Sequence, residues 1–283
     1  MASSFFSSSS RRRPGSAPPG GGELPSILMQ ACRERGWAFH VIALRGQTDP
    51  ASLAGVPHDW IRMGEPLTAM QRLRAEGADR VVFCGKFHRP SLRDLVLDRW
   101  ALRFLARIGG RLLSDNRLIE ALVKEIESKG FSVIGPADVA ASLLARHGPY
   151  GRLSPTPDEE RAIAEGFAAA RRAGRRDVGQ AAVVQRGSVI DLEGPDGTDA
   201  LIARCAARQQ GGSGAILVKA RKPQQQMRND PPVIGLPTVQ KAAAAGFRGI
   251  AVEAGGVLVL QGAALGDAAD AAGMFVVGAD VPA

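Results

Sequence analysis

Apolar positions in the first half of the chain follow two alternating patterns. Some segments repeat apolar residues every three or four positions, as amphipathic helices do, and others are short apolar runs, as buried strands are. This spacing predicts helices at 24–35, 65–77, 97–108 and 116–130, and strands at 37–44, 79–85 and 131–135. Because helices and strands alternate with short connections, we expect an α/β fold with a Rossmann-like parallel sheet and flanking helices.

A different pattern begins after residues 147–157, HGPYGRLSPTP, where Gly and Pro predict a linker. Two strands are predicted within 180–194, joined at Arg186-Gly187 as a hairpin. Further strands are predicted at 214–220, 249–254, 256–261 and 274–278, and helices at 158–173, 198–209, 237–245 and just before 274. We therefore expect an N-terminal α/β domain over 20–146, the linker at 147–157, and a C-terminal mixed α/β domain over 158–283.

Residues 1–19 show neither pattern. The segment is rich in Ser, Arg and Pro, and the first acidic residue of the chain is Glu23. It lacks the apolar core of a secretory signal. We expect 1–19 to be a disordered tail that is dispensable for catalysis.

Composition and charge narrow the class of protein. The chain has 283 residues, of which 45% are apolar and 23% charged, as is typical of a soluble globular protein. Lys and Arg exceed Asp and Glu by eight (36 against 28), which favours an anionic partner: a phosphorylated metabolite, a nucleic acid or an acidic membrane surface. Aromatic residues make up only 5%, which argues against a single-strand nucleic-acid binder that stacks bases. No apolar run approaches the ~20 residues of a membrane span.

The cysteines favour no metal or redox site. Cys32, Cys84 and Cys205 are isolated from one another, with no CxxC pair or Cys/His cluster. Each has apolar neighbours, so we expect all three to fill the core.

Two loops in the N-terminal half are candidate sites for an anion. The turn Gly20, Gly21 and Gly22 precedes a predicted helix, so its amides could hold a phosphate, although a plain tight turn explains it equally well. The loop GKFHRP at 85–90 follows a predicted strand, where ligands of α/β sheets bind. Lys86 is therefore placed for an anion, and a solvated basic loop is the alternative.

The turn EGPDGTDAL at 193–201 gathers acidic residues. Glu193, Asp196 and Asp199 surround two glycines, and Thr198 is a candidate helix cap. Mg²⁺ takes oxygen ligands of this kind. Asp196 and Thr198 are equally explained as turn and cap residues.

Residues 218–235, VKARKPQQQMRNDPPVIG, interrupt a strand with a cationic loop. Lys219, Lys222 and Arg228 supply positive charge, and Asp230 stands directly before two prolines that restrict the backbone. Cations that neutralise phosphates beside one fixed carboxylate suit diphosphate chemistry. An exposed loop without function is the alternative.

Together these segments resemble one family. The blocks that carry the resemblance are GGGELP (20–25), FCGKFHRPSL (83–92), LSDNRLIEALVKEIESKGFSVIG (113–135), DVGQAAVVQRGSV (177–189), EGPDGTDALIAR (193–204), GAILVKARKP (214–223), NDPPVIG (229–235) and AAAAGFRGIAVEAG (242–255). They occur in the order of the LpxI family, the UDP-2,3-diacylglucosamine pyrophosphatases of lipid A biosynthesis. The resemblance runs from about Gly20 to Gly278.

The resemblance implies a fold and a reaction. It implies two α/β domains with substrate between them, and Mg²⁺-dependent hydrolysis of UDP-2,3-diacylglucosamine to UMP and 2,3-diacylglucosamine 1-phosphate. It also implies a cytoplasmic protein, bound peripherally to the inner membrane of a Gram-negative cell, and leaves a homodimer open. The net positive charge suits an anionic substrate in an anionic leaflet.

On this basis we assign roles to the candidate residues. Asp230 is expected to be the catalytic or metal-positioning carboxylate, with Asp199 and Glu193 as further Mg²⁺ ligands. The expected substrate-binding residues are Lys219, Lys222 and Arg228 for the diphosphate, Thr198 and Gln180 in support, Lys86 for an anion, and Gly20, Gly21 and Gly22 over the uridine or a phosphate.

The chain departs from the family pattern in two places. The family has a short apolar strand directly before the Gly-rich turn, but here Pro18 and Pro19 stand there, and proline does not fit a central strand. We therefore expect the first strand to be absent or replaced. Gln226 stands where the family commonly has an acid.

Two other functions remain open at this point. One is a module that binds a nucleotide sugar or another anionic ligand without hydrolysis, which product formation would distinguish. The other is a basic nucleic-acid-binding protein, which a steep dependence of RNA affinity on salt would reveal. Within the leading hypothesis, nucleic acid is not a partner.

Overall fold

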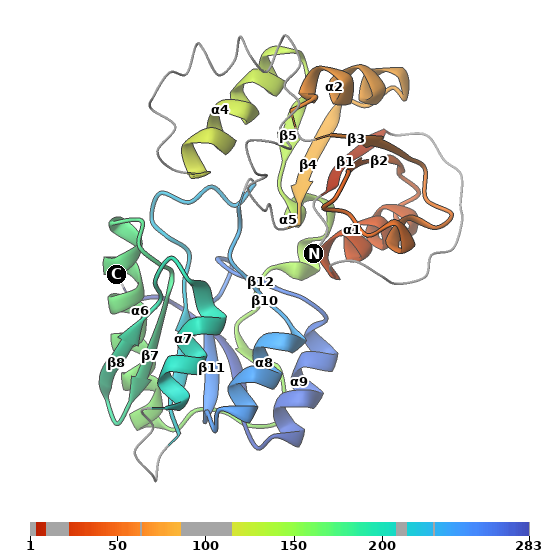
Figure 1. Ribbon diagram of the computed structural model, residues 1–283. Helices are drawn as coiled ribbons and strands as arrows, with labels where there is room; N and C mark the ends of the chain where they lie inside the picture. The colour runs from red at the N-terminus through yellow and green to blue at the C-terminus, as the bar shows by residue number, and fades with distance from the viewer. Residues whose placement is uncertain are drawn as a thin grey trace. The chain divides into compact units, whose positions relative to one another are not determined.

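The protein divides into two compact units in the computed structural model, which describes residues 4–9, 23–62, 64–85, 115–207, 214–228 and 230–282 (Figure 1). The first unit is Met1–Ala141 with Arg228–Asp230, and the second is Ser142–Met227 with Pro231–Ala283. The division therefore falls before the linker predicted at 147–157. That segment belongs to the second unit, because Gly148–Pro149 forms the edge strand β6 and Thr156 caps the next helix.

The first unit contains a five-stranded sheet in the order β3-β2-β1-β4-β5. The pairs β2 with β3 and β4 with β5 are parallel, in agreement with the expected parallel sheet, although the apolar spacing did not predict the strand β3. The strands are β1 (Ser4–Ser9), β2 (Ala38–Leu44), β3 (His58–Ile61), β4 (Arg80–Cys84) and β5 (Ser132–Ile134). The helices are α1 (Glu23–Glu34), α2 (Pro66–Ala75), α4 (Asp115–Ser128) and α5 (Pro136–Val139), with short 3₁₀ turns at Pro50–Leu53 and Ala141–Leu143.

The central strand of this sheet corrects the prediction for the N-terminus. Strand β1 runs antiparallel to both β2 and β4, so a disordered tail over 1–19 is wrong for Ser4–Ser9. Strands β2 and β4 each present a row of backbone N–H and C=O groups that must be paired. The segment SFFSSS supplies these bonds and contains no proline, whereas Pro18 and Pro19 lie outside the strand.

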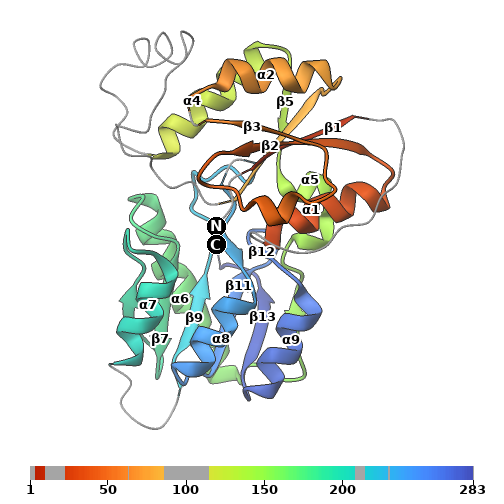
Figure 2. The same ribbon diagram turned by 45° about the vertical axis from the view of Figure 1, so that its right-hand side comes forward.

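Helices cover both faces of the first sheet. Apolar residues of α2 and α4 pack on the face formed by residues such as Ile42, Leu44 and Phe83. Helix α1 buries Leu28 and Cys32 beneath the opposite face (Figure 2). The predicted flanking helices are thereby confirmed where the structure describes them, and the helix predicted at 97–108 lies outside the described residues.

The second unit contains a six-stranded mixed sheet in the order β6-β13-β11-β9-β7-β8. Strands β13, β11 and β9 are parallel, and β7, β8 and β6 run antiparallel to their neighbours. The strands are β7 (Ala181–Gln185), β8 (Ser188–Leu192), β9 (Ile216–Lys219), β11 (Gly249–Glu253) and β13 (Phe275–Ala279). The predicted hairpin is confirmed, because Arg186 and Gly187 both have positive φ, as a type I′ turn requires.

The helices of the second unit sandwich this sheet (Figure 2). Helix α6 (Pro157–Arg175) packs Phe167 and its neighbours on one face, and comes so close that a Cβ on Gly166 would lie 2.6 Å from the Val218 side chain. Helices α7 (Gly197–Ala206), α8 (Leu236–Ala244) and α9 (Gly262–Ala271) cover the other face. None of the helices in the described part of the chain is long and apolar enough to cross a membrane.

One strand in the second unit is shorter than predicted. The strand expected at 256–261 shrinks to β12 (Leu258–Val259), which pairs in parallel with β10 (Val233–Ile234). It does not join β11, because β9 and β13 already occupy both edges of β11. The pair β10-β12 places the end of the 218–235 segment beside the start of α8.

Candidate functional site

A buried polar cluster lies at the carboxyl end of β9. Lys219, only 6% exposed, donates from Nζ to the Thr198 hydroxyl oxygen at 3.0 Å and to the Val233 carbonyl at 3.1 Å. The Thr198 hydroxyl donates in turn to Oε1 of Glu193, and Oε2 of Glu193 accepts from the backbone N–H of Gln180 at 2.7 Å. Four residues that the sequence predicted as site residues therefore meet in one cluster.

Strand register explains why these residues meet. Lys219 is the last residue of β9 and pairs with Ala181 of β7 on one side and Val252 of β11 on the other. Glu193 follows β8, whose antiparallel pairing with β7 returns it to the start of β7. A Cβ on Gly179 would lie 2.1 Å from the Glu193 carbonyl oxygen, so only glycine allows this approach. The cluster thus forms at the carboxyl edge of the parallel strands, where ligands of α/β proteins bind.

The electrostatics of the cluster are nearly balanced. A buried ammonium and a buried carboxylate, 6% and 5% exposed, share one hydroxyl group. Buried charges are tolerated when they are paired in this way. Within the described part of the chain, the buried Oε1 of Gln180 has no hydrogen-bond donor. Because buried polar atoms are normally satisfied, this amide oxygen is an acceptor available beside the cluster.

A second buried acid, which the sequence reasoning missed, anchors the start of the cationic loop. Glu253 ends β11, is 7% exposed, and accepts from the Arg171 guanidinium at 3.1 Å and from the Arg221 backbone N–H at 2.7 Å. The sequence signal that could have revealed Glu253 is its place as an acidic residue at the carboxyl end of the apolar run 249–253. Glu253 therefore fixes the backbone directly after Lys219 and Ala220.

The other two predicted cations of the 218–235 segment are paired within the protein. Lys222, with a side chain 15% exposed, donates to Asp177 at 2.7 Å in the second unit. Arg228 pairs with Glu127 at 2.8 Å, and both belong to the first unit, as does the exposed Asp230. Arg228 and Asp230 therefore belong to the first unit, whereas Lys219 and Lys222 belong to the second.

The remaining acids of the 193–201 turn have separate ion partners. Asp199 is exposed and pairs with Lys241, and Asp196 pairs with Arg204. A hydrogen bond from Arg204 to Asp191 is the main cause that raises the pKa of this arginine. Across the described ranges, no group of three or more His, Cys, Asp or Glu side chains is placed to hold a metal ion. Glu193 and Asp199 thus face different partners.

Several predicted residues lie outside the described part of the chain: Gly20, Gly21, Gly22 and Lys86. Their roles stay predictions. The expectation that the cysteines fill the core is confirmed, because Cys32, Cys84 and Cys205 are all buried. Burial raises the pKa of the Cys32 thiol to about 11 and that of Cys84 to about 12.

Comparison with known proteins covers both units. Residues 19–143 match the family model for the LpxI N-terminal domain, and residues 146–277 match that for the LpxI C-terminal domain. The chain is also 38% identical over 266 residues to the UDP-2,3-diacylglucosamine pyrophosphatase LpxI of Caulobacter vibrioides. This alignment covers 92% of the chain and 95% of that relative.

Proposed function

Because the chain belongs to the LpxI family, we propose that it hydrolyses the diphosphate of UDP-2,3-diacylglucosamine in lipid A biosynthesis. The products are UMP and 2,3-diacylglucosamine 1-phosphate. The observation that carries this proposal is the alignment with the Caulobacter pyrophosphatase over nearly the full length of both chains. The buried cluster at the carboxyl edge of β9 supports it, because it gathers a cation and hydrogen-bonding groups of the kind that bind phosphate.

Lys219 and Thr198 are the groups of this cluster suited to a phosphate. The Lys219 ammonium is held by a hydroxyl and a carbonyl, so its position is fixed before substrate arrives. A cation in a buried site of low dielectric stabilises a nearby negative charge more strongly than one in water does. Glu193 then acts as the group that orients Thr198, and the Gln180 amide oxygen supplies a further acceptor for a substrate hydroxyl.

Asp230 is the proposed catalytic carboxylate. It is exposed and precedes Pro231, which restricts the Asp230 backbone to extended conformations. In hydrolysis, the oxygen of a water molecule bonds to phosphorus while the bond from that phosphorus to the bridging oxygen breaks. Asp230 would orient this water and accept its proton, and Arg228, two residues earlier, would stabilise the phosphate charge.

The residues present fit a single-carboxylate site for Mg²⁺. In phosphate chemistry Mg²⁺ is commonly held by one or two carboxylates together with substrate phosphates and water. Asp230 can serve as that carboxylate, whereas both oxygens of Glu193 accept protein hydrogen bonds and Asp199 pairs with Lys241. Bound there, the ion would neutralise charge on the diphosphate. We accordingly propose that Glu193 positions Thr198 and that Asp199 forms a surface ion pair with Lys241 instead of binding Mg²⁺.

The substrate also implies a place of action. Its two acyl chains lie in a membrane, so we propose that the protein binds peripherally to the cytoplasmic face of the inner membrane. The net charge of +8 supports attraction to an anionic leaflet. Exposed arginines at the end of α6, Arg172, Arg175 and Arg176, contribute to this positive charge.

Product analysis tests the proposed function. Purified protein is incubated with UDP-2,3-diacylglucosamine and Mg²⁺, and the products are identified by mass. Release of UMP and 2,3-diacylglucosamine 1-phosphate in equal amounts is expected. Substrate that binds but stays intact would instead support the non-hydrolytic binding module.

A further inference from the structure

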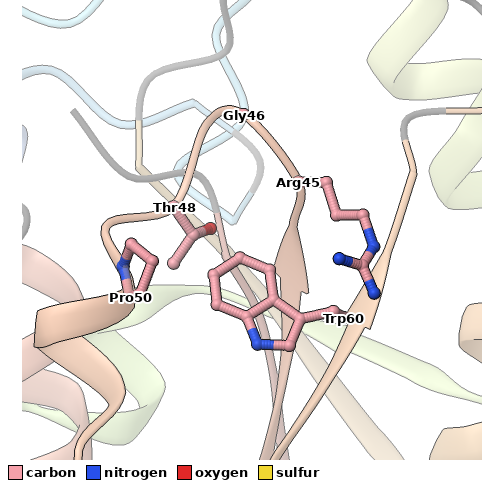
Figure 3. A pocket seen from close by; sticks show the side chains of 5 residues that line it. All are labelled: Arg45, Gly46, Thr48, Pro50 and Trp60. Atoms are coloured by element: carbon pink, nitrogen blue, oxygen red, sulfur yellow. The ribbon is translucent and has the colours of Figure 1, made fainter.

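A pocket of about 430 Å³ lies in the first unit, at the carboxyl ends of the parallel strands β2 and β3 (Figure 3). It is lined by Arg45, Gly46, Thr48, Pro50 and Trp60. None of these residues belongs to the cluster around Lys219 or to the 193–201 turn. Its volume falls within the range of small-molecule sites, roughly 300–1,000 Å³.

Strand register places the two largest lining side chains together. Ala43 of β2 pairs with Trp60 of β3, so the small side chain leaves room beside the indole. Arg45 follows Ala43 by two residues and therefore projects on the same face, while its backbone N–H donates to the Ile61 carbonyl at 2.9 Å. In Figure 3 the indole lies between Arg45 on one side and Thr48 and Pro50 on the other.

Trp60 is only partly engaged in packing. The indole is half-buried and, among the described residues, belongs neither to the cluster beneath α2 and α4 nor to the clusters of the second unit. Its ring meets His58 edge to face, with centroids 5.8 Å apart and planes at 88°. Considering only the described residues, the indole N–H has no hydrogen-bond partner. An aromatic ring that lines a pocket in this way is available for stacking.

Arg45 is likewise unused. It is exposed, and its guanidinium forms no ion pair with any described residue. Other cations near the proposed chemistry, Lys222 and Arg228, have carboxylate partners. The neighbouring turn is rigid, because the Thr48 hydroxyl accepts from the Leu44 N–H at 3.1 Å. The pocket thus combines one unpaired cation with one aromatic ring.

We infer that this pocket binds the nucleotide end of the substrate, with the uracil ring stacked on Trp60 and a phosphate held by Arg45. A nucleoside phosphate can make both interactions at once, because its base stacks on an aromatic side chain while its phosphate contacts a guanidinium. A free phosphate would use Arg45 alone and leave the indole without a role. This inference rests on the proposed function for the identity of the base as uracil, and it places the base on Trp60 instead of on the Gly20–Gly22 turn.

Binding of UMP, uridine and inorganic phosphate to the full chain tests the inference by calorimetry. We expect Trp60→Leu to weaken UMP binding on the order of tenfold to a hundredfold, and Trp60→Phe to restore most of it. Arg45→Ala should weaken UMP binding but leave uridine binding nearly unchanged. Arg62→Ala, which removes an exposed arginine beyond the pocket lining, is the matched control and should bind UMP as the unchanged protein does.

The outcomes separate this inference from the proposed function. Equal UMP affinity in Trp60→Leu and the unchanged protein would overturn the inference. So would a protein that binds inorganic phosphate as tightly as UMP and loses this phosphate binding in Arg45→Ala. Turnover of UDP-2,3-diacylglucosamine with no effect of Trp60→Leu on its KM would also overturn it, while the proposed function stands. Loss of UMP binding in Trp60→Leu, in a protein that hydrolyses no UDP-2,3-diacylglucosamine, would support the pocket and refute the activity.

Discussion

The Lys219 ammonium lies 3.0 Å from the Thr198 hydroxyl oxygen, and that hydroxyl donates to the carboxylate of Glu193. One hydroxyl group therefore connects two buried charges from different elements, since Lys219 ends β9 and Thr198 lies in the first turn of α7. The connection fixes where the ammonium points and depends on a side chain that both donates and accepts.

Removing this hydroxyl should destabilise the protein and lower its activity. Thr198→Val keeps the shape of the side chain but leaves Lys219 and Glu193 each without one partner, which should reduce the free energy of unfolding by about 1–3 kcal/mol. Thr198→Ser keeps the hydroxyl and is the matched control. Urea unfolding measures the change in stability, and kcat/KM at saturating Mg²⁺ measures the change in activity. Equal free energies of unfolding and equal kcat/KM in Thr198→Val and Thr198→Ser would refute the bridging role of the hydroxyl.

Strand β1 should be required for stability. Ser7→Pro removes a backbone N–H from the centre of the first sheet, where Ser7 lies between His40 and Val81. A loss of about 2–3 kcal/mol would lower Tm by roughly 4–12 °C, given about 2–4 °C per kcal/mol in domains of this size. Ser16→Pro, outside β1, is the control.

Deleting residues 2–10 should have a larger effect than Ser7→Pro, because it removes the whole strand. Unchanged Tm and turnover in the deletion variant would contradict this prediction and show that the segment is a dispensable tail.

The thiols should be protected at neutral pH. Burial raises the pKa of Cys32 to about 11 and of Cys84 to about 12, so neither is a thiolate in the native state near pH 8. Ellman's reagent should therefore titrate all three cysteines in denaturant and none within minutes in native protein. Rapid native labelling of one thiol would contradict their placement in the core.

The same shifts predict how stability depends on pH. Because the folded pKa exceeds the ordinary value of 9.0, the unfolded chain loses thiol protons first as pH rises. The contribution of these thiols to stability is complete below pH 9 and is lost as pH rises through the folded pKa values. Urea midpoints at pH 8 and pH 10 should show this decrease.

Membrane binding should be electrostatic in large part. The protein should sediment with vesicles that contain anionic lipid at low salt and be released as the salt concentration rises. The reason is that the Debye screening length falls to roughly 3 Å near 1 M salt. Neutral vesicles should retain less protein under every condition. Full retention at the highest salt would indicate insertion of apolar side chains instead.

Local patterns made most of this fold predictable. Helix α6 has regular apolar spacing and a capping box, in which Glu159 N–H donates to the Thr156 hydroxyl oxygen at 3.3 Å and Thr156 N–H donates to Glu159 at 2.7 Å. Strand β1 was missed because SFFSSS has only two apolar residues and is a strand only through pairing with β2 and β4. Two-residue strands such as β10 depend on tertiary context in the same way.

The site was predictable only in part. Lys219 ends the buried apolar run of β9, so its place at the carboxyl edge of the sheet could be expected, whereas Glu193 follows β8, which is exposed or half-buried along its length. The ion pairs of Asp199 with Lys241 and Arg228 with Glu127 join residues 42 and 101 positions apart, which no local pattern reveals. The same holds for the pocket of Arg45 and Trp60, which depends on the register of β2 against β3.

The most direct test of the account measures kcat and KM of Asp230→Asn with UDP-2,3-diacylglucosamine and Mg²⁺. The variant removes the carboxylate that we propose as the acceptor of the proton of water, so kcat should fall by roughly 10²–10⁴ while KM changes little. Asp199→Asn, which removes an exposed carboxylate paired with Lys241, is the matched control and should keep near-normal turnover. Near-normal turnover in Asp230→Asn together with an inactive Asp199→Asn would contradict the account and place the catalytic carboxylate in the 193–201 turn.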